Sequence, residues 1–469
     1  MGYSVMGVLF PLIIMPYISR ILLPAGLGQV SYAQNITSYF ILVASLGIPN
    51  YGIREIAKNS QELQNRSQTF LEIFLINFIS TVIASFMYYL FIFQTGYFAE
   101  KKVIFGIVGI SLILNALNID WFYKGMEEFR YITVRSYTIK IISVFAIFLL
   151  VRSENDVNIY ALILTLATSA NYIFNIFHVK KYVVLQKYNL NLKKHLKKII
   201  YLFATAAAVE LYAKLDVTMV GLICGEVYVG YYSNDMKIIR IVAVIITSLG
   251  SVLLPRFSVY YQEKKLEQLN SVTEKAVEYI MFISFPCAVG LFLESEAIVR
   301  VLFGEAFLPA IVTMQILAIL IPILSIGNIF GTQLLIALDQ EKKLTITVII
   351  GAVINIALNS FMIRSFQHNG AAAASVIAEL AVMTAQIILT RPYVKIKLNY
   401  KLVIKIMVQT CIMAAALIFI NQIAILWTIK LLLSVILGAM IYFAAGLLIR
   451  NNVLNNMISI CKDLFLKQS

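Results

Sequence analysis

The sequence predicts an all-α polytopic membrane protein with fourteen transmembrane helices and both termini in the cytoplasm. Three observations predict this fold class. First, the chain of 469 residues is 60% hydrophobic and 13% charged, with a mean hydropathy of +0.85, whereas soluble domains are about 45–50% apolar and about 25% charged. Second, long apolar segments alternate with short polar connections. Third, the positive charges concentrate in every second connection.

Each apolar segment is about long enough for the roughly 20 residues that a membrane helix needs. In order, the predicted segments are Tyr3–Ile18, Tyr32–Tyr51, Phe70–Phe93, Val103–Tyr123, Tyr131–Val151, Ile159–Val179, Ile199–Ile223, Met236–Pro255, Ala276–Leu293, Ile311–Leu338, Leu344–Phe366, Ala371–Thr390, Leu402–Ile420 and Ile423–Leu448.

The distribution of Lys and Arg orients these segments. Most of the 38 basic residues lie in the even-numbered connections and in the C-terminal tail. Because Lys and Arg are enriched on the cytoplasmic side of membrane proteins, the even-numbered connections and both termini are predicted to be cytoplasmic. The net charge of +14 is then the cytoplasmic rim facing anionic lipid, and no nucleic-acid partner is expected.

The chain divides into three predicted parts: a six-helix bundle over 1–190, a second over 191–392, and two further helices with a cytoplasmic tail over 393–469. Ser45-Leu46-Gly47 recurs as Ser248-Leu249-Gly250 near the same end of the second and eighth segments, which indicates a repeat. Transporters are often built from such repeats, with the substrate site between them. No connection is long enough to form a soluble domain.

Several kinds of site are not expected. The four cysteines and three histidines are scattered and lack metal-ligand spacing, so neither a metal site nor a disulfide framework is predicted. The chain has no P-loop, which argues against ATP hydrolysis, and no cofactor is expected.

Ionisable residues inside the apolar segments are the candidate site. Glu210, Lys214 and Asp216 lie in the seventh segment, and Lys140 and Glu379 lie in the fifth and twelfth. Glu210 and Lys214 are four residues apart and can pair on one helix face. Each charge costs about 2.5–3.5 kcal/mol at the centre of a membrane helix. These residues must therefore be paired or face water, and a hydrated central cavity is the simplest arrangement.

Other charges lie nearer to the segment ends. Lys237 and Arg240 share a face of the eighth segment, Arg20 and Arg54 flank the first two, and Asp120 lies near the end of the fourth. Such residues can extend a cationic cavity lining, but they can also snorkel to the interface. A purely structural ion pair is a further alternative for the deeper residues.

An ordered set of short motifs resembles one known family. The motifs are Pro16–Leu22 with Gly26–Gly28, Leu46–Glu55, Asp120–Gly125, Lys214–Asp216, Lys237 with Arg240, Leu254–Ser258 and Leu302–Glu305. Along nearly its whole length, the chain resembles the polysaccharide transporter family. These are the Wzx-type flippases of O-antigen and capsule repeat units, within the multidrug/oligosaccharidyl-lipid/polysaccharide exporter superfamily.

The resemblance implies two six-helix bundles plus two helices around a V-shaped cavity in the bacterial plasma membrane. It implies transfer of an undecaprenyl-pyrophosphate-linked oligosaccharide from the inner to the outer leaflet, with a polysaccharide polymerase and chain-length machinery as partners. Arg20, Arg54, Lys214, Lys237 and Arg240 match positions where such proteins place cavity or gating cations. Members usually carry a short basic segment before the first helix. Here that helix begins close to Met1, and we interpret it as a retained span.

The hypothesis is therefore a flippase that works by alternating access. The cationic residues, Lys140 included, attract the pyrophosphate or acidic sugars, whereas Asp120, Glu210, Asp216 and Glu379 balance charge or couple transport to a proton or sodium gradient. One alternative is a cation-coupled multidrug exporter of the same superfamily, which would have more prominent acids. Another is a membrane-embedded polysaccharide polymerase, which would normally need a sizeable loop. No enzymatic activity is expected.

Overall fold

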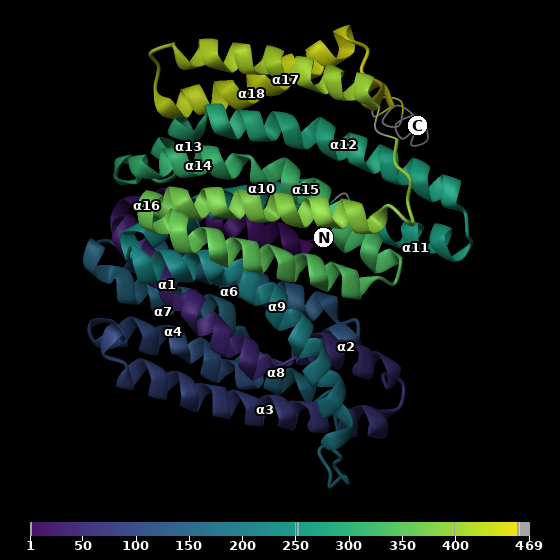
Figure 1. The fold of residues 1–469 in the computed structure, drawn as a ribbon. Coiled ribbons are helices and arrows are strands. Elements are labelled where there is room, and N and C mark those ends of the chain that lie inside the picture. Colours follow the sequence, from purple (N-terminus) through teal and green to yellow (C-terminus); the bar gives the residue numbers. More distant parts are fainter. Residues whose placement is uncertain (1, 249, 251–252, 398, 457–458, 460–469) are drawn as a thin grey trace, which may run out of the picture. The chain divides into compact units, whose positions relative to one another are not determined.

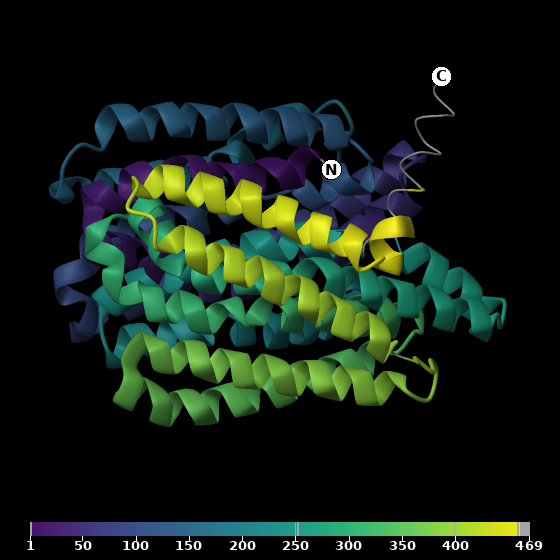
Figure 2. The same ribbon diagram turned by 90° about the horizontal axis from the view of Figure 1, so that it is seen from above.

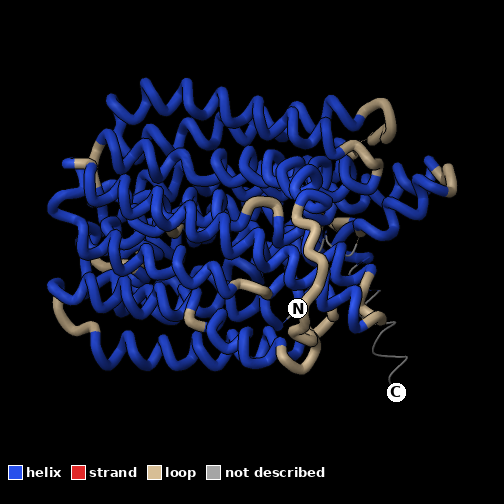
Figure 3. The backbone as a smooth tube through the Cα atoms, turned by 90° about the horizontal axis from the view of Figure 1, so that it is seen from below, coloured by secondary structure: helices blue, strands red, loops and turns tan. Residues whose placement is uncertain are grey.

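The computed structural model describes residues 2–248, 250, 253–397, 399–456 and 459. Figure 3 shows helices joined by short loops, with no strand among these residues, which confirms the predicted all-helical class. Leu249 of the Ser-Leu-Gly repeat and most of the C-terminal tail lie outside the described residues. The chain forms two compact units, unit 1 over Met1–Gly230 and unit 2 over Tyr231–Ser469, which are treated separately below. The three-part division at 190 and 392 remains a proposal.

Unit 1 is built from nine α-helices joined by short 3₁₀ turns. They are α1 (Gly2–Ser45), α2 (Ile48–Lys58), α3 (Leu63–Gln94), α4 (Lys102–Leu114), α5 (Asp120–Gly125), α6 (Phe129–Leu150), α7 (Val157–Ser169), α8 (Asn171–Val179) and α9 (Lys193–Ile223), with the turns η1 (Gly96–Lys101), η2 (Asn115–Leu117) and η3 (Glu154–Asp156). α1 packs against α3, α4 and α9, and α4 packs against α7, so these helices run side by side in Figure 1.

The first predicted segment and most of the second lie in one helical element, α1, which is broken at Leu23, and the second segment ends in α2. This residue has φ 57° and ψ 177° within α1. The next residue, Pro24, has no backbone N–H to donate and restricts the conformation of the residue before it. The chain therefore changes direction at Leu23 and resumes as a helix that contains most of the second predicted segment.

Unit 2 begins within α10. Its helices are α10 (Glu226–Ser248), α11 (Leu254–Gln262), α12 (Leu266–Leu293), α13 (Ser295–Leu302), α14 (Ile311–Ala318), α15 (Leu320–Asn328), α16 (Glu341–Thr390), α17 (Tyr400–Asn421) and α18 (Trp427–Leu448), with a 3₁₀ turn, η5 (Glu305–Ala310), and a π-helical turn, η6 (Ile329–Leu335). α17 and α18 form a hairpin that packs on α12 through α17.

A second break divides α16 into two antiparallel halves, which lie side by side in Figure 2. Gln367 has φ 53° and ψ −132° at the break. A Cβ placed on Gly370 would lie 2.0 Å from the carbonyl oxygen of Met362, so only glycine permits this close return of the chain. The halves contain the eleventh and twelfth predicted segments.

The surface of the long helices is apolar, as expected for a lipid-facing surface. Phe86 on α3, Phe145 on α6 and Phe361 on α16 are 69%, 70% and 76% exposed. Among the described residues, nine helical stretches are long and apolar enough to cross a membrane. One of them, Phe10–Lys58, runs through α1 and α2 and includes most of the first two predicted segments, and another, α16, holds the eleventh and twelfth. α9 is not among the nine; it carries Glu210, Lys214 and Asp216 near its centre. The protein is a multi-pass membrane protein; the count of fourteen remains a prediction.

Candidate functional site

The predicted ion pair on α9 is present. Lys214 Nζ lies 3.4 Å from Glu210 Oε2, and the two side chains are 29% and 49% exposed. The neighbouring helix α1 supports this part of α9, because Asn35 Nδ2 donates to the Lys214 carbonyl at 3.2 Å and to Thr218 Oγ1 at 2.7 Å. A polar seam between α1 and α9 therefore holds the pair in place while both charged ends stay partly exposed.

The other predicted residues of unit 1 lie on several helices. Arg20 is exposed three residues before the break in α1, and its guanidinium donates to the Pro16 carbonyl. Arg54 is exposed on α2, Lys140 is half-buried on α6, and Asp216 is half-buried on α9. Their roles in a cavity remain proposals.

Asp120 has a structural partner that the sequence analysis missed. Its Oδ1 accepts from Arg135 Nη2 at 2.8 Å and from Asn175 Nδ2 at 3.0 Å. Arg135 is 8% exposed, and its guanidinium lies 5.1 Å from the centre of the Tyr131 ring. The signal was present, since Arg135 lies inside the fifth predicted segment. Asp120 thus joins α5 to α6 and α8.

A buried acid, Glu72 on α3, is not among the residues predicted from the sequence. Its side chain is fully buried. Oε2 lies 2.6 Å from Lys194 Nζ and 2.8 Å from His195 Nε2, while Oε1 accepts from the Asn191 backbone N–H at 2.8 Å. His195 Nδ1 is 2.7 Å from the hydroxyl of Tyr51 on α2. These contacts fasten the start of α9 to α2 and α3.

Unit 2 holds the remaining predicted residues. Lys237 and Arg240 are exposed on α10, and Lys237 Nζ donates to Asn234 Oδ1 at 3.2 Å. Glu379 is half-buried on the second half of α16. α10 begins ten residues before the predicted eighth segment, because the polar and aromatic residues at its start lower the local hydropathy.

A polar pocket of about 270 Å³ lies inside unit 1. Uncharged side chains of α1, η2, α4, α7 and α8 line it: Gln34, Ile41, Val108, Ser111, Asn115, Thr165, Thr168, Ser169 and Tyr172. The hydroxyls of Ser111, Thr165 and Thr168 donate to carbonyls of their own helices. Each hydroxyl oxygen keeps acceptor capacity toward the pocket, so the pocket suits a neutral, hydrogen-bonding ligand.

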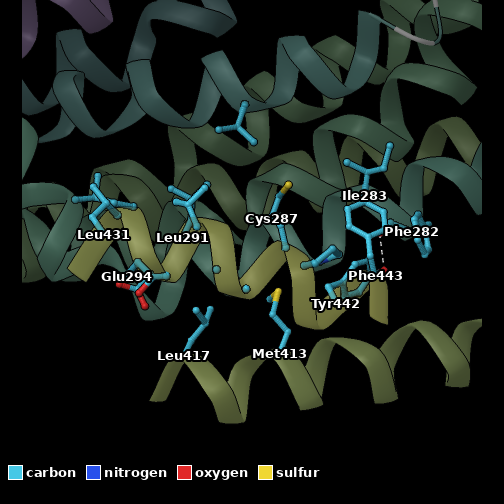
Figure 4. A pocket seen from close by; sticks show the side chains of 18 residues that line it. Phe282, Ile283, Cys287, Leu291, Glu294, Met413, Leu417, Leu431, Tyr442 and Phe443 are labelled. Carbon is cyan, nitrogen blue, oxygen red and sulfur yellow. Dashed lines mark hydrogen bonds between the residues drawn. The ribbon is translucent and has the colours of Figure 1, made fainter. Parts of the chain in front are cut away.

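An apolar groove of about 500 Å³ lies inside unit 2 between α12, α17 and α18. Figure 4 shows Cys287, Leu291, Met413 and Leu417 along it, with the carboxylate of Glu294 at one end. The Tyr442 hydroxyl donates to the Phe282 carbonyl at 2.6 Å. This groove suits an apolar chain and not a polar head group. In the described part of the chain, no group of three or more His, Cys, Asp or Glu residues could hold a metal ion.

Comparison with protein families identifies the chain. The sequence profile of the family described as "polysaccharide biosynthesis protein" matches residues 2–261, more than half of the sequence. The chain belongs to the polysaccharide biosynthesis protein family. This result confirms the resemblance drawn from the motifs, most of which lie in the matched region.

Individual relatives agree with the family. A protein of Escherichia coli K12 that carries the name O-antigen transporter is 21% identical over 390 residues, 82% of this chain and 93% of its own. The lipid II flippase MurJ in an inward closed conformation has a TM-score of 0.70 at 16% identity and covers 95% of this chain and 100% of its own. A multidrug resistance MATE transporter in an inward-facing conformation has a TM-score of 0.65 at 13% identity, with 82% and 93% covered. These structures share the fold.

Proposed function

We propose that this protein is a flippase that moves an undecaprenyl-pyrophosphate-linked oligosaccharide from the inner to the outer leaflet of the bacterial plasma membrane. The repeat unit would serve the synthesis of a surface polysaccharide, such as a capsule or an O-antigen. The observation that carries this proposal is the partly exposed Lys214–Glu210 pair beside Asp216, near the centre of the long helix α9. Family membership and the name of the Escherichia coli relative support the same cargo class.

The physical problem is the polar head of the cargo. A pyrophosphate and its sugars cannot enter hydrocarbon without losing their hydration, so the protein must offer a wet, cationic route while the lipid tail stays in the bilayer. The residues that would attract the anionic head are Arg20, Arg54, Lys140, Lys214, Lys237 and Arg240, and the acids that would balance charge or couple transport are Asp120, Glu210, Asp216 and Glu379. The Asp120–Arg135 contact favours a positioning role for that acid.

The polar pocket of unit 1 would contact the sugar. Two of its lining residues are accessible, since Gln34 is half-buried and Thr168 is exposed, and all of its lining residues are uncharged. Hydroxyl and amide groups match the donors and acceptors of a neutral sugar ring. Replacing Thr168 with Val keeps the shape but removes the hydroxyl. It is expected to reduce export of the glycan, whereas Thr138→Val on the exposed face of α6 should not.

A cation-coupled multidrug exporter is the second candidate, favoured by the shared fold with a MATE transporter. The two differ in what they bind, since an exporter of cationic drugs needs acids to dominate its site. Six of the ten candidate site residues are basic, which favours an anionic cargo. A polymerase is less well supported, because the relatives named above are transporters or flippases. We propose that the chain translocates its cargo without catalysing a reaction on it, and that a separate polymerase and chain-length machinery follow.

Charge reversal tests the proposal. Lys214→Glu and Arg54→Glu are each expected to abolish surface polysaccharide while membrane levels of the protein stay normal. Lys401→Glu, an exposed residue at the start of α17, is the matched control and should leave export unchanged. Normal surface polymer in both cavity variants would rule out the cationic route.

A further inference from the structure

Asp235 on α10 is a buried acid without a visible partner. The residue is 0% exposed, and neither carboxylate oxygen has a hydrogen-bond partner within the described residues. The two residues before it are also buried, and Ser233 Oγ and Asn234 Nδ2 likewise lack partners in this part of the structure. An uncharged carboxyl can share this environment, but an isolated carboxylate would lose its hydration without compensation.

Two other acids that are at least partly buried have several partners, and a third, Glu294, has one, since its Oε1 accepts from Asn421 Nδ2 at 3.1 Å. Glu72 contacts Lys194, His195 and a backbone N–H, and Asp120 contacts Arg135 and Asn175. These acids have the partners that a structural carboxylate needs. Asp235 differs from them because neither of its carboxylate oxygens has such a partner in the described part of the chain. Structural packing therefore does not explain why this position carries an acid.

The position of Asp235 on its helix explains its isolation. Asp235 shares a face with Tyr232, three residues earlier, whose hydroxyl lies 3.0 Å from Ser375 Oγ on α16. Ala371, Ala372 and Ala374 around Ser375 are fully buried, so this part of α16 is tightly packed and apolar. Lys237 follows by two residues and projects from the opposite side of α10, where it is exposed.

Asp235 also lies deep in its helix. It is nine residues from the start of α10 at Glu226, which corresponds to about 13 Å at 1.5 Å per residue. A helix of 23 residues has the length needed to cross the hydrocarbon core, and Asp235 lies near its middle, although α10, like α9, is not among the nine apolar stretches. Ionisable residues at this depth are costly and usually serve transport or proton transfer.

We propose that Asp235 is a proton-binding site that gains and loses one proton during the transport cycle. In the structure described here the carboxyl is protonated and sealed from water. When α10 exposes it to an aqueous phase, the O–H bond breaks, the carboxylate keeps the electron pair, and water accepts the proton. The binding of the proton is independent of the cargo; its use in driving transport rests on the proposed function.

Several charged or titratable groups could influence this site, and they lie on three elements. They are Lys237 and Arg240 on α10, His368 and Glu379 on α16, and Glu305 on η5. The ring of Tyr231 on α10 contacts Phe307 of η5 and His368 of α16. Both cations are exposed on α10. After α10 has moved they would be the first groups able to stabilise a deprotonated Asp235.

Infrared spectroscopy of the full-length protein tests the protonation directly. Spectra of the wild type and of Asp235→Asn are recorded in lipid vesicles at neutral pH, and the second is subtracted from the first. The difference is expected to contain the C=O stretching band of a protonated carboxyl. Asp235→Glu should shift that band and provides the assignment if the Asn variant does not fold. A difference spectrum that contains only carboxylate bands would overturn the proposal.

A functional arm tests whether the proton is used. In a deletion strain, Asp235→Asn should be present at wild-type level but lose surface polymer, while Ser233→Ala, which alters the neighbouring buried polar residue, should retain it. A protonated carboxyl band together with normal polymer in Asp235→Asn would show a purely structural acid and overturn the proposal. If the deletion strain itself keeps normal surface polymer, the proposed function fails, and the infrared result still decides the proton site.

Discussion

Glu72 and His195 are 123 residues apart in the chain and share a buried hydrogen bond of 2.8 Å between Oε2 and Nε2. Lys194 contacts the same oxygen at 2.6 Å, and Tyr51 lies 2.7 Å from the other ring nitrogen of His195. The segment that leads from α8 to α9 is thereby fastened to α2 and α3. Any movement of α9 relative to these helices must break or carry this cluster.

Replacing Glu72 with Gln should destabilise the protein. The amide keeps the shape but cannot pair with Lys194, and it leaves a buried hydrogen-bond site mismatched, so the loss is expected to be about 1–3 kcal/mol. The measurement is thermal unfolding of the purified full-length protein in detergent. Glu62→Gln, at an exposed position just before α3, is the control; equal unfolding temperatures for the two variants would contradict the prediction.

Asp120 and Arg135 should be energetically coupled. Their ion pair at 2.8 Å is largely buried, and residues in one hydrogen-bonded network typically show coupling energies of about 0.5–3 kcal/mol. We expect Asp120→Asn and Arg135→Gln each to destabilise the protein and the double variant to cost less than their sum. A double-mutant cycle on unfolding measures this coupling, and strict additivity would mean that the contact contributes nothing.

Gly28 is expected to tolerate no side chain. A Cβ at this position would lie 1.8 Å from the Glu226 carbonyl oxygen, so Gly28→Ala must separate α1 from the start of α10. Gly106 on α4 has no atom within 4 Å of the corresponding point, and Gly106→Ala should be neutral or stabilising by up to about 1 kcal/mol. Comparing the yield and unfolding temperature of the two alanine variants tests this difference.

Tyr182 provides a pH-dependent contact outside the membrane segments. Its hydroxyl donates to Glu128 Oε1 at 2.5 Å, and burial together with this carboxylate raises the pKa of Tyr182 to about 12. Because the pKa is higher in the folded state than the ordinary value of 10, the stabilisation is complete below pH 10 and disappears as the pH rises through 12. The stability advantage of the wild type over Tyr182→Phe should therefore shrink across that range. An advantage that stays constant would contradict the assignment.

The fold class and the charged centre of α9 could both be predicted from the sequence. Long apolar segments fix the all-helical class because a membrane demands internally satisfied backbones. The Glu210–Lys214 pair was predictable because a spacing of four places both side chains on one helix face. Both features depend on patterns within a single helix, which can be recognised in the sequence.

Features that depend on distant parts of the chain could not be predicted. The partners of Asp120 are 15 and 55 residues away, and no local pattern links them. The predicted eighth segment starts at Met236 and leaves Asp235 in the preceding connection, because the residues around it lower the hydropathy; only its burial reveals it. The break at Gln367 is set by the return of the chain over Gly370, which sequence spacing does not show.

The most direct test of the central claim is the distribution of lipid-linked repeat units between the two leaflets in a deletion strain, measured together with surface polymer. A flippase predicts that surface polymer is lost and that complete lipid-linked units accumulate in the cytoplasmic leaflet. Complete units that reach the outer leaflet and remain unpolymerised would contradict the claim and assign the chain a role in polymerisation.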